Sequence, residues 1–281
     1  MTAEESSSPR ILTDDDVAKL SPVVPDHRLS YGANPEQFGD LYLPPQPGLH
    51  PVVIMIHGGC WRALYGLGHL GQLCAALRNE GIAVWNMEYR RLGNGGGWPT
   101  TFEDVAAGTD FLRGVACRFS LDLSRVVTAG HSAGGHLALW LAGRHRLPET
   151  SRLYSAVALP VRGVVSLAGI PDLAEGVKQN ICNGACLELV AGLPEEVPHR
   201  YRQASPVALL PFGVPQWHLV GLLDQFVPVG YLQRYVAVAG QHDEVHLDLL
   251  QDVGHYELIV PATSAWSAVR HAVLTLLLGC R

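Results

Sequence analysis

The sequence predicts an α/β fold with a doubly wound, mostly parallel sheet, helices on both faces and a small helical cap. Short apolar runs alternate with segments of helical spacing, which is typical of a parallel sheet covered on both faces. The first run, PVVIMI at 51–56, is made of β-branched and apolar residues, as in a strand buried on both sides. Later, RVVTAG at 125–130 leads straight into a helical segment at 132–144, as a strand, a tight turn and a helix would.

The elements of the first half follow in order. After the strand at 51–56, LGQLCAALRNEG at 70–81 has helical spacing and ends at a glycine, which predicts a helix that stops there. The run IAVWNMEY at 82–89 predicts the next strand. TFEDVAAGTDFLRGVA at 101–116 opens with threonine and has acidic residues in its first turn, so a helix is expected.

The second half continues the alternation with one interruption. Further strands are expected at 162–169, 215–221 and 244–250, and a closing helix at 262–278. Between 172 and 211 strand periodicity is lost and several prolines occur, which predicts a small helical cap over the C-terminal edge of the sheet. The polar residues 1–30 are expected to form a loosely held arm or a short helix. We therefore expect an N-terminal arm, 1–30, and one domain, 31–281, with a cap insertion.

Composition and charge narrow the function classes. Hydrophobic residues make up 48% of the 281 residues and charged residues 16%, which is enough apolar surface for a large core. The 20 Lys and Arg against 26 Asp and Glu give a formal charge of −6 without a basic run, so no nucleic-acid partner is expected. The start lacks the pattern of a secretory signal, and no apolar segment is long enough to span a bilayer. A cytoplasmic protein with no membrane partner is expected.

The six cysteines are scattered, as in an intracellular enzyme rather than a disulfide scaffold. Their positions are Cys60, Cys74, Cys117, Cys182, Cys186 and Cys280. The pair Cys182 and Cys186 has a spacing that suits a metal or a bridge, but no second pair completes a zinc site. Free thiols are therefore the expectation.

The strongest chemical signal is Gly130-His131-Ser132-Ala133-Gly134, a G-x-S-x-G pattern between a strand and a helix. A serine on this strained turn is lifted above the sheet, and the glycines are required because side chains beside it would collide with the neighbouring strand and helix. The turn also aims the backbone N–H of Ala133 at the reaction centre. Ser132 is therefore the predicted nucleophile.

A second signal, His57-Gly58-Gly59, follows the strand at 51–56 directly. An oxyanion that forms in acyl transfer needs preorganised donors, and backbone N–H groups serve best where no Cβ blocks the approach. Alone, these residues fit a flexible turn equally well, but upstream of a serine elbow they are the expected oxyanion loop. Gly58, Gly59 and Ala133 are the predicted donors, and His57 is expected to hold the loop through hydrogen bonds.

A serine hydroxyl needs a base to remove its proton, and the base needs an orienting acid. Among thirteen histidines, His255 is favoured because it lies in a glycine-containing loop between the last strand and the last helix. The chain order Ser, acid, His favours Asp224, which follows the penultimate strand. Asp252 is the alternative, but it lies only three residues before His255 and would have to fold back on its own turn.

Motifs spread along the chain resemble one family. They are HGGCW (57–61), EYRR (88–91), WPTTFEDV (98–105), GHSAGGHLA (130–138), LAGIPDL (167–173), ASPV (204–207), LDQFVP (223–228) and GHYEL (254–258). From about Tyr31 to the C-terminus, the sequence resembles the esterase and kynurenine formamidase branch of the α/β-hydrolases. The resemblance implies the α/β-hydrolase fold and the site residues named above: the triad Ser132, Asp224 and His255 and the oxyanion donors Gly58, Gly59 and Ala133.

The resemblance also implies that Trp61 lines or supports the mouth of the active site. Trp61, Trp98 and Phe226 are candidate substrate-binding aromatics, although isolated aromatic residues more often serve as packing. Cys60 stands where the formamidases usually carry a tyrosine, and Gly135 where they commonly carry an alanine. Both departures weigh against a formamidase more than against a hydrolase.

Two other patterns lack the context that their chemistry requires. Residues 66–71 match G-x-G-x-x-G, but they do not follow a strand directly and no acidic residue is placed to hold a ribose. His242 and His246 are spaced as in helical zinc proteases, but the segment that follows alternates like a strand and Asp243 replaces the glutamate. No cofactor and no metal are expected.

The predicted function is therefore that of a serine hydrolase that cleaves small carboxylic esters through an acyl-enzyme intermediate. An arylformamidase acting on N-formylkynurenine or a related formamide is the alternative, because it would use the same catalytic residues. A non-catalytic binding protein on the same scaffold is a third interpretation, which a complete triad and oxyanion loop disfavour. The expected partner is a small ester or formamide substrate.

Overall fold

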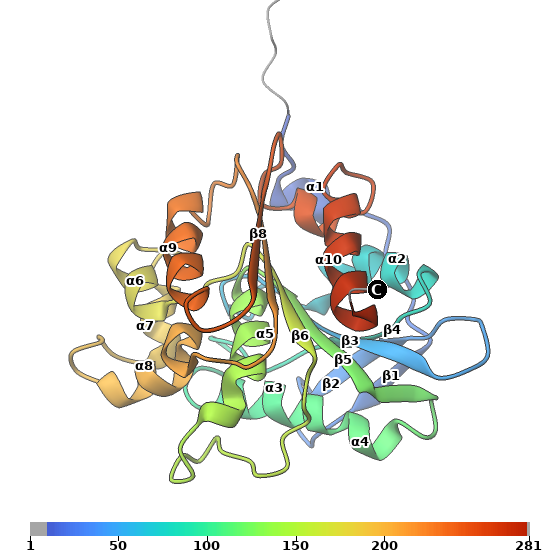
Figure 1. Cartoon of the computed structure of the whole chain (residues 1–281), viewed down its shortest axis with the longest axis horizontal. Helices are drawn as coiled ribbons and strands as arrows, with labels where there is room; N and C mark the ends of the chain where they lie inside the picture. Colours follow the sequence, from blue (N-terminus) through green and yellow to red (C-terminus); the bar gives the residue numbers. More distant parts are fainter. Residues whose placement is uncertain (1–9, 280–281) are drawn as a thin grey trace, which may run out of the picture.

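The computed structural model describes residues 10–279, and its centre is one eight-stranded sheet (Figure 1). The strand order is β1-β2-β4-β3-β5-β6-β7-β8. The pairings β1–β2 and β2–β4 are antiparallel, and all the others are parallel. The bounds are β1 His27–Ser30, β2 Phe38–Tyr42, β3 His50–Ile56, β4 Ala83–Met87, β5 Leu121–His131, β6 Gly163–Leu167, β7 Gln216–Gly221 and β8 Val245–Leu250.

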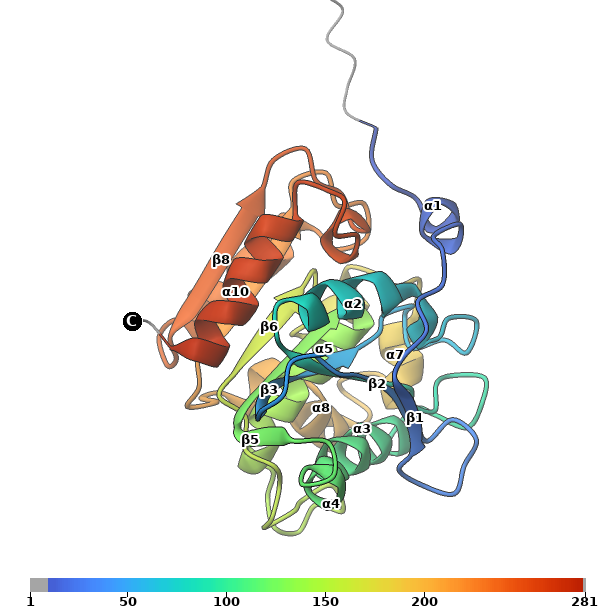
Figure 2. The same cartoon turned by 90° about the vertical axis from the view of Figure 1, so that its right-hand side faces the viewer.

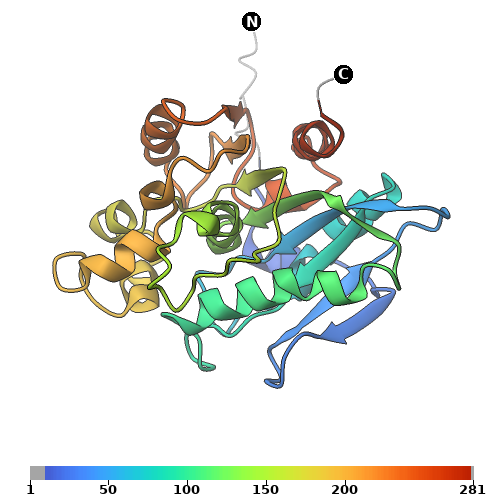
Figure 3. The same ribbon diagram turned by 60° about the horizontal axis from the view of Figure 1, so that its bottom comes forward.

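Helices cover both faces of this sheet. Figure 2 shows α2 and α10 on one side of it and α3 and α4 on the other, and Figure 3 shows α5 on the same side as α3. The bounds are α2 Gly71–Asn79, α3 Thr100–Asp110, α4 Leu112–Val115, α5 Ala133–Gly143, α9 Val229–Ala239 and α10 Trp266–Leu278. The prediction of a doubly wound, mostly parallel sheet is confirmed.

Burial explains why the central strands read as continuous apolar runs. Every residue of β4 is buried, and so are the last five residues of β3, because both faces of these strands are covered. Helix α5 is buried along its whole length, since it packs on β5 and β6 and beneath the segment that follows β6. These central elements fix the position of the turn between β5 and α5.

The segment 172–211 contains short helices, which lie together beside α9 (Figure 1). Their bounds are α6 Leu173–Lys178, α7 Ala185–Val190, α8 Pro198–Ala204 and the 3₁₀ turn η3 Pro206–Leu209. Other 3₁₀ turns are η1 Leu67–Leu70, η2 Arg144–Arg146 and η4 Glu257–Ile259. Within residues 10–279, no helix combines the length and the apolar character that crossing a bilayer requires.

Of the two alternatives expected for residues 1–30, a loosely held arm or a short helix, the structure shows a short helix within residues 10–30. This helix is α1, Asp14–Ala18, and the last residues of the region form strand β1, which pairs with β2 at the edge of the sheet. Strand β1 has no apolar pattern in the sequence, because three of its four residues are exposed and none is fully buried. The sheet therefore starts at His27, before the expected domain boundary at residue 31.

Candidate active site

Ser132 lies where β5 passes into α5, on a strained turn. Its φ of 54° and ψ of −119° are unusual for a residue with a side chain. A Cβ on Gly130 would lie 2.2 Å from the carbonyl oxygen of Gly134, and one on Gly134 would lie 2.0 Å from that of Ile56. Glycine is therefore required on both sides of Ser132, for the steric reason that the sequence indicated.

The loop after β3 passes close to Ser132. A Cβ on Gly58 would lie 2.7 Å from the carbonyl oxygen of His131 and 3.1 Å from the Cβ of Ser132. Gly59 has a φ of 102°, a region that favours glycine. Ala133 is the first residue of α5, where backbone N–H groups have no partner within the helix. The structure thus brings together the three residues predicted as oxyanion donors.

His57 holds this loop, as predicted. Its Nδ1 lies 2.8 Å from the carbonyl oxygen of Gly58, and its Nε2 lies 2.7 Å from Oε1 of the buried Glu88. Burial alone would raise the pKa of Glu88, but His57 and Arg91 outweigh it and the pKa is lowered. Tyr89 stacks on the His57 ring and donates its hydroxyl to the His57 carbonyl oxygen. The buried Glu88 carboxylate thereby fixes the orientation of the loop.

Asp224, and not Asp252, faces His255. Nδ1 of His255 lies 2.7 Å from Oδ2 of Asp224, whose side chain is fully buried. The other oxygen, Oδ1, accepts the backbone N–H groups of Phe226 and Val227, each at 2.8 Å. Asp252 is exposed. The carboxylate of Asp224 is therefore held by its own turn and aimed at the imidazole.

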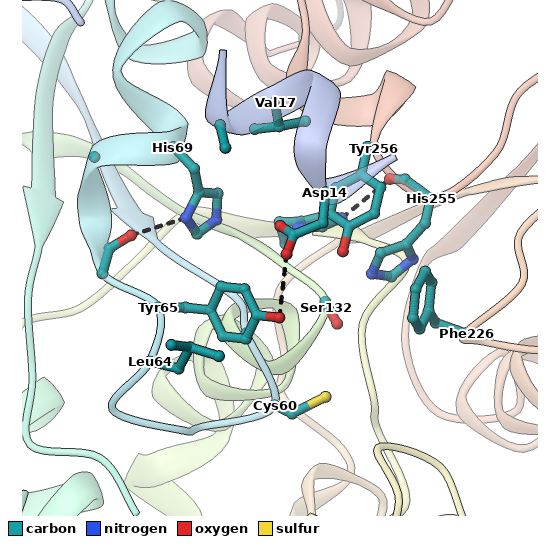
Figure 4. Close-up of a pocket in the computed structure, with 15 residues that line it drawn as sticks. Asp14, Val17, Cys60, Leu64, Tyr65, His69, Ser132, Phe226, His255 and Tyr256 are labelled. Carbon is teal, nitrogen blue, oxygen red and sulfur yellow. Dashed lines mark hydrogen bonds between the residues drawn. The ribbon is translucent and has the colours of Figure 1, made fainter. Parts of the chain in front are cut away.

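Ser132 and His255 line one cavity of about 510 Å³ (Figure 4). This volume is in the range of small-molecule sites. The loop after β3, helix α1 and the loops after β7 and β8 also contribute to its walls. Burial lowers the pKa of His69 to about 4 and holds the pKa of His131 well below its usual value, so these two of the lining histidines are neutral at pH 7.

Of the three candidate substrate-binding aromatics, Phe226 lines this cavity and the two tryptophans lie elsewhere. Trp61 is fully buried and packs edge-on against His136, with ring centroids 5.2 Å apart. Trp98 packs against Phe102. Trp61 and Trp98 are absent from the described lining of this cavity, and Trp98 is only partly buried against the core.

The expectation of free thiols at Cys60 and Cys182 is wrong. The two form a disulfide, with Cα atoms 5.5 Å apart, that joins the loop after β3 to the segment 172–211. Arg62 and Glu188 add a bidentate ion pair between the same two regions, with N–O distances of 2.8 and 2.7 Å. Cys60 follows the oxyanion loop directly, so the disulfide tethers that loop.

The sequence did not indicate that the N-terminal segment belongs to the site. Asp14, Val17 and Ala18 of α1 line the cavity. The segment 172–211, expected to form a cap, contributes none of the described lining residues. A signal for α1 was present: Thr13 and Asp16 form a capping box, a pattern that marks the start of a helix. Its position over the cavity depends on contacts with residues far along the chain and has no local signal.

Comparisons with known proteins agree with this architecture. The family BD-FAE matches residues 39–231. Esterase LipC from Mycobacterium tuberculosis is 27% identical over 234 residues, which cover 74% of this chain and 53% of LipC. The probable isoprenylcysteine alpha-carbonyl methylesterase ICMEL2 from Arabidopsis thaliana is 34% identical over 110 residues, which cover 38% of this chain and 25% of that protein. The chain thus spans about half, or less, of the length of these relatives.

Solved structures share the fold at low sequence identity. An inhibited esterase B from Lactobacillus rhamnosis superimposes with a TM-score of 0.76 at 22% identity, over 90% of this chain and 87% of that chain. A truncated carbohydrate esterase from gut microbiota gives a TM-score of 0.76 at 19% identity, over 89% of this chain and 95% of that chain. The α/β-hydrolase fold expected from the sequence motifs is confirmed.

Proposed function

The chain belongs to the BD-FAE family and has the α/β-hydrolase fold, and on that premise we propose that it is a serine hydrolase of small carboxylic esters. One observation carries the proposal. An Asp224–His255 pair with a 2.7 Å contact faces the same cavity as Ser132, which stands on a strained turn beside the two loop glycines. Nucleophile, base and orienting acid are the parts that acyl transfer needs.

Each residue has a role in the proposed reaction. Because Nδ1 of His255 donates to Asp224, its Nε2 is available to accept the proton of Ser132. The Ser132 oxygen then attacks the ester carbonyl carbon, and a tetrahedral oxyanion forms. Asp224 stabilises the imidazolium that results, which keeps the proton ready for the departing alcohol.

The oxyanion is received by the backbone N–H groups of Gly58, Gly59 and Ala133. When it collapses, the ester C–O bond breaks, His255 gives its proton to the alcohol, and the acyl group remains on Ser132. Water then attacks the acyl-enzyme with His255 again as base, and the carboxylic acid leaves.

The size of the cavity supports small substrates. A volume of about 510 Å³ accommodates a short acyl ester and is small for a long-chain lipid. The names of the relatives, an esterase and a methylesterase, support ester chemistry. Cys60, at the position where formamidases usually carry tyrosine, is engaged in the disulfide with Cys182 and offers no aromatic contact to an aryl amine.

Comparing kcat/KM for three substrates tests the proposal: 4-nitrophenyl butyrate, 4-nitrophenyl palmitate and N-formylkynurenine. We expect the butyrate ester to react fastest, because the palmitoyl chain would take up most of the cavity volume and amide resonance raises the barrier for the formamide. Ser132→Ala is the control, since it removes the nucleophile without adding volume. A clear preference for N-formylkynurenine would contradict the ester assignment and support the arylformamidase alternative.

A further inference from the structure

The N-terminal residues 10–18 are tied to the loop that carries His255. The buried carboxylate of Glu257 accepts the backbone N–H of Leu12 through Oε1 and that of Gly254 through Oε2. Ile11 packs beside Gly254, where a Cβ would meet the Ile11 side chain at 3.2 Å. One carboxylate, that of Glu257, thus joins the N-terminal segment to the loop of His255. Glu257 lies only two residues after the proposed catalytic histidine.

These contacts place helix α1 against the cavity. The capping box of Thr13 and Asp16 starts the helix, and Val17 buries its side chain in the hydrophobic core. Asp14 also lines the cavity, and its Oδ2 accepts a hydrogen bond of 3.3 Å from the Tyr65 hydroxyl (Figure 4). Tyr65 belongs to the loop after β3, so Asp14 and Tyr65 reach toward each other from two walls of the cavity.

Asp14 is the acidic side chain in the described wall of this cavity. Among the residues within 10–279 that line it, Asp14 is the only carboxylate, and none is a lysine or an arginine. The histidines His69 and His131 are neutral at pH 7, because burial lowers the pKa of both. Asp14 is therefore the one carboxylate that the described lining presents to a bound substrate, since Asp224 lies behind His255 and outside the lining.

We propose that Asp14 is a specificity-determining residue, which selects esters bearing an ammonium group over esters bearing a carboxylate. This proposal rests on the proposed esterase function. Three lining side chains, Tyr65, Phe226 and Tyr256, add aromatic rings to the wall of the same cavity. A carboxylate beside aromatic faces is the chemistry that binds an ammonium ion. The same charge repels an anionic substrate, so both effects act on one ratio of rates.

Three esters of similar size test this proposal: 4-nitrophenyl 4-(trimethylammonio)butanoate, neutral 4-nitrophenyl 5,5-dimethylhexanoate and anionic mono-4-nitrophenyl adipate. The measurement is kcat/KM for each ester with the wild type, Asp14→Asn and Asp15→Asn. Asp14 and Asp15 are both exposed residues of α1, but Asp15 lies outside the cavity lining. Its variant therefore makes the same change in net charge without altering the wall of the cavity. Asparagine at position 14 retains an oxygen that can accept the Tyr65 hydroxyl.

We expect the ratio of cationic to anionic kcat/KM to fall roughly tenfold in Asp14→Asn and to stay at the wild-type value in Asp15→Asn. A general loss of activity cancels in this ratio, since the same Ser132 attacks all three esters. The wild-type ratio should also shrink at 1 M salt, which screens the charge. An unchanged ratio in Asp14→Asn, or an equal fall in Asp15→Asn, would overturn the proposal. Failure of the wild type to cleave the neutral ester would instead refute the esterase function.

Discussion

Replacing Cys60 and Cys182 by alanine removes the covalent tie between the oxyanion loop and the segment 172–211. The disulfide spans 122 residues of sequence. In the chain-entropy description, closing a loop of that length lowers the entropy of the unfolded chain by about 16 cal/mol/K, which is about 5 kcal/mol at 25 °C. An unfolding entropy of about 2.1 cal/mol/K per residue gives roughly 590 cal/mol/K for 281 residues, so the expected decrease in Tm is about 8 °C.

Calorimetry at a matched scan rate measures this decrease in Cys60→Ala, Cys182→Ala and the double variant. Each single variant breaks the whole bond, so the double variant should lose no more than about 1 to 2 °C beyond either single one. Cys117→Ala is the control, because Cys117 is an exposed free thiol. Reduced wild type should unfold at the temperature of the double variant. Two results would refute the disulfide as the source of stability. One is a decrease in Tm of the double variant that equals the sum of the two single decreases, and the other is a wild-type Tm that does not change when the reductant is added.

Three further predictions concern the catalytic pair and the buried histidines. Asp224→Asn should lower kcat by about 10⁴-fold, because the amide no longer fixes the tautomer of His255 or stabilises its imidazolium. Asp252→Asn should leave kcat within about twofold, and the reverse pattern would show that the acid is misassigned. Burial lowers the pKa of His136 to about 4 and that of His218 to about 3 from 6.5, so the unfolded chain binds more protons between pH 6.5 and 4. Stability should therefore fall as the pH drops through this window, by about 1.4 kcal/mol per pH unit for each histidine. Calorimetry at pH 5.5 in buffers of different ionisation enthalpy should detect the uptake of at least about two protons on unfolding, and no uptake would contradict the assignment of neutral buried histidines.

The sequence predicted the features that depend on local pattern. The turn around Ser132 and the glycine loop after β3 are visible in sequence because neighbouring residues alone create the steric requirement. His255 and Asp224 were identified from their order relative to the strands, and the structure places their side chains 2.7 Å apart. Continuous apolar runs also revealed β3 and the other central strands, since both of their faces are buried.

Features that depend on distant contacts had no such signal. Cys60 and Cys182 are 122 residues apart, and only the folded chain brings them together. The interior position of Trp61 follows from its packing on His136, which belongs to another element. Helix α1 reaches the cavity because Glu257, more than 240 residues away, anchors Leu12. The sequence therefore identified the proposed catalytic groups and Phe226 but did not indicate that α1 contributes to the wall of the cavity.

Covalent labelling with a fluorophosphonate tests the central claim most directly. The reagent reacts with a serine that an adjacent base activates, and the turn between β5 and α5 presents Ser132 to the cavity beside His255. We predict one adduct per chain by intact mass spectrometry, located on Ser132 by peptide mapping, with loss of ester hydrolysis in proportion to labelling. Ser132→Ala should remain unlabelled. An adduct on another serine, such as Ser166 or Ser205, or ester hydrolysis that persists in the fully labelled protein, would contradict the account.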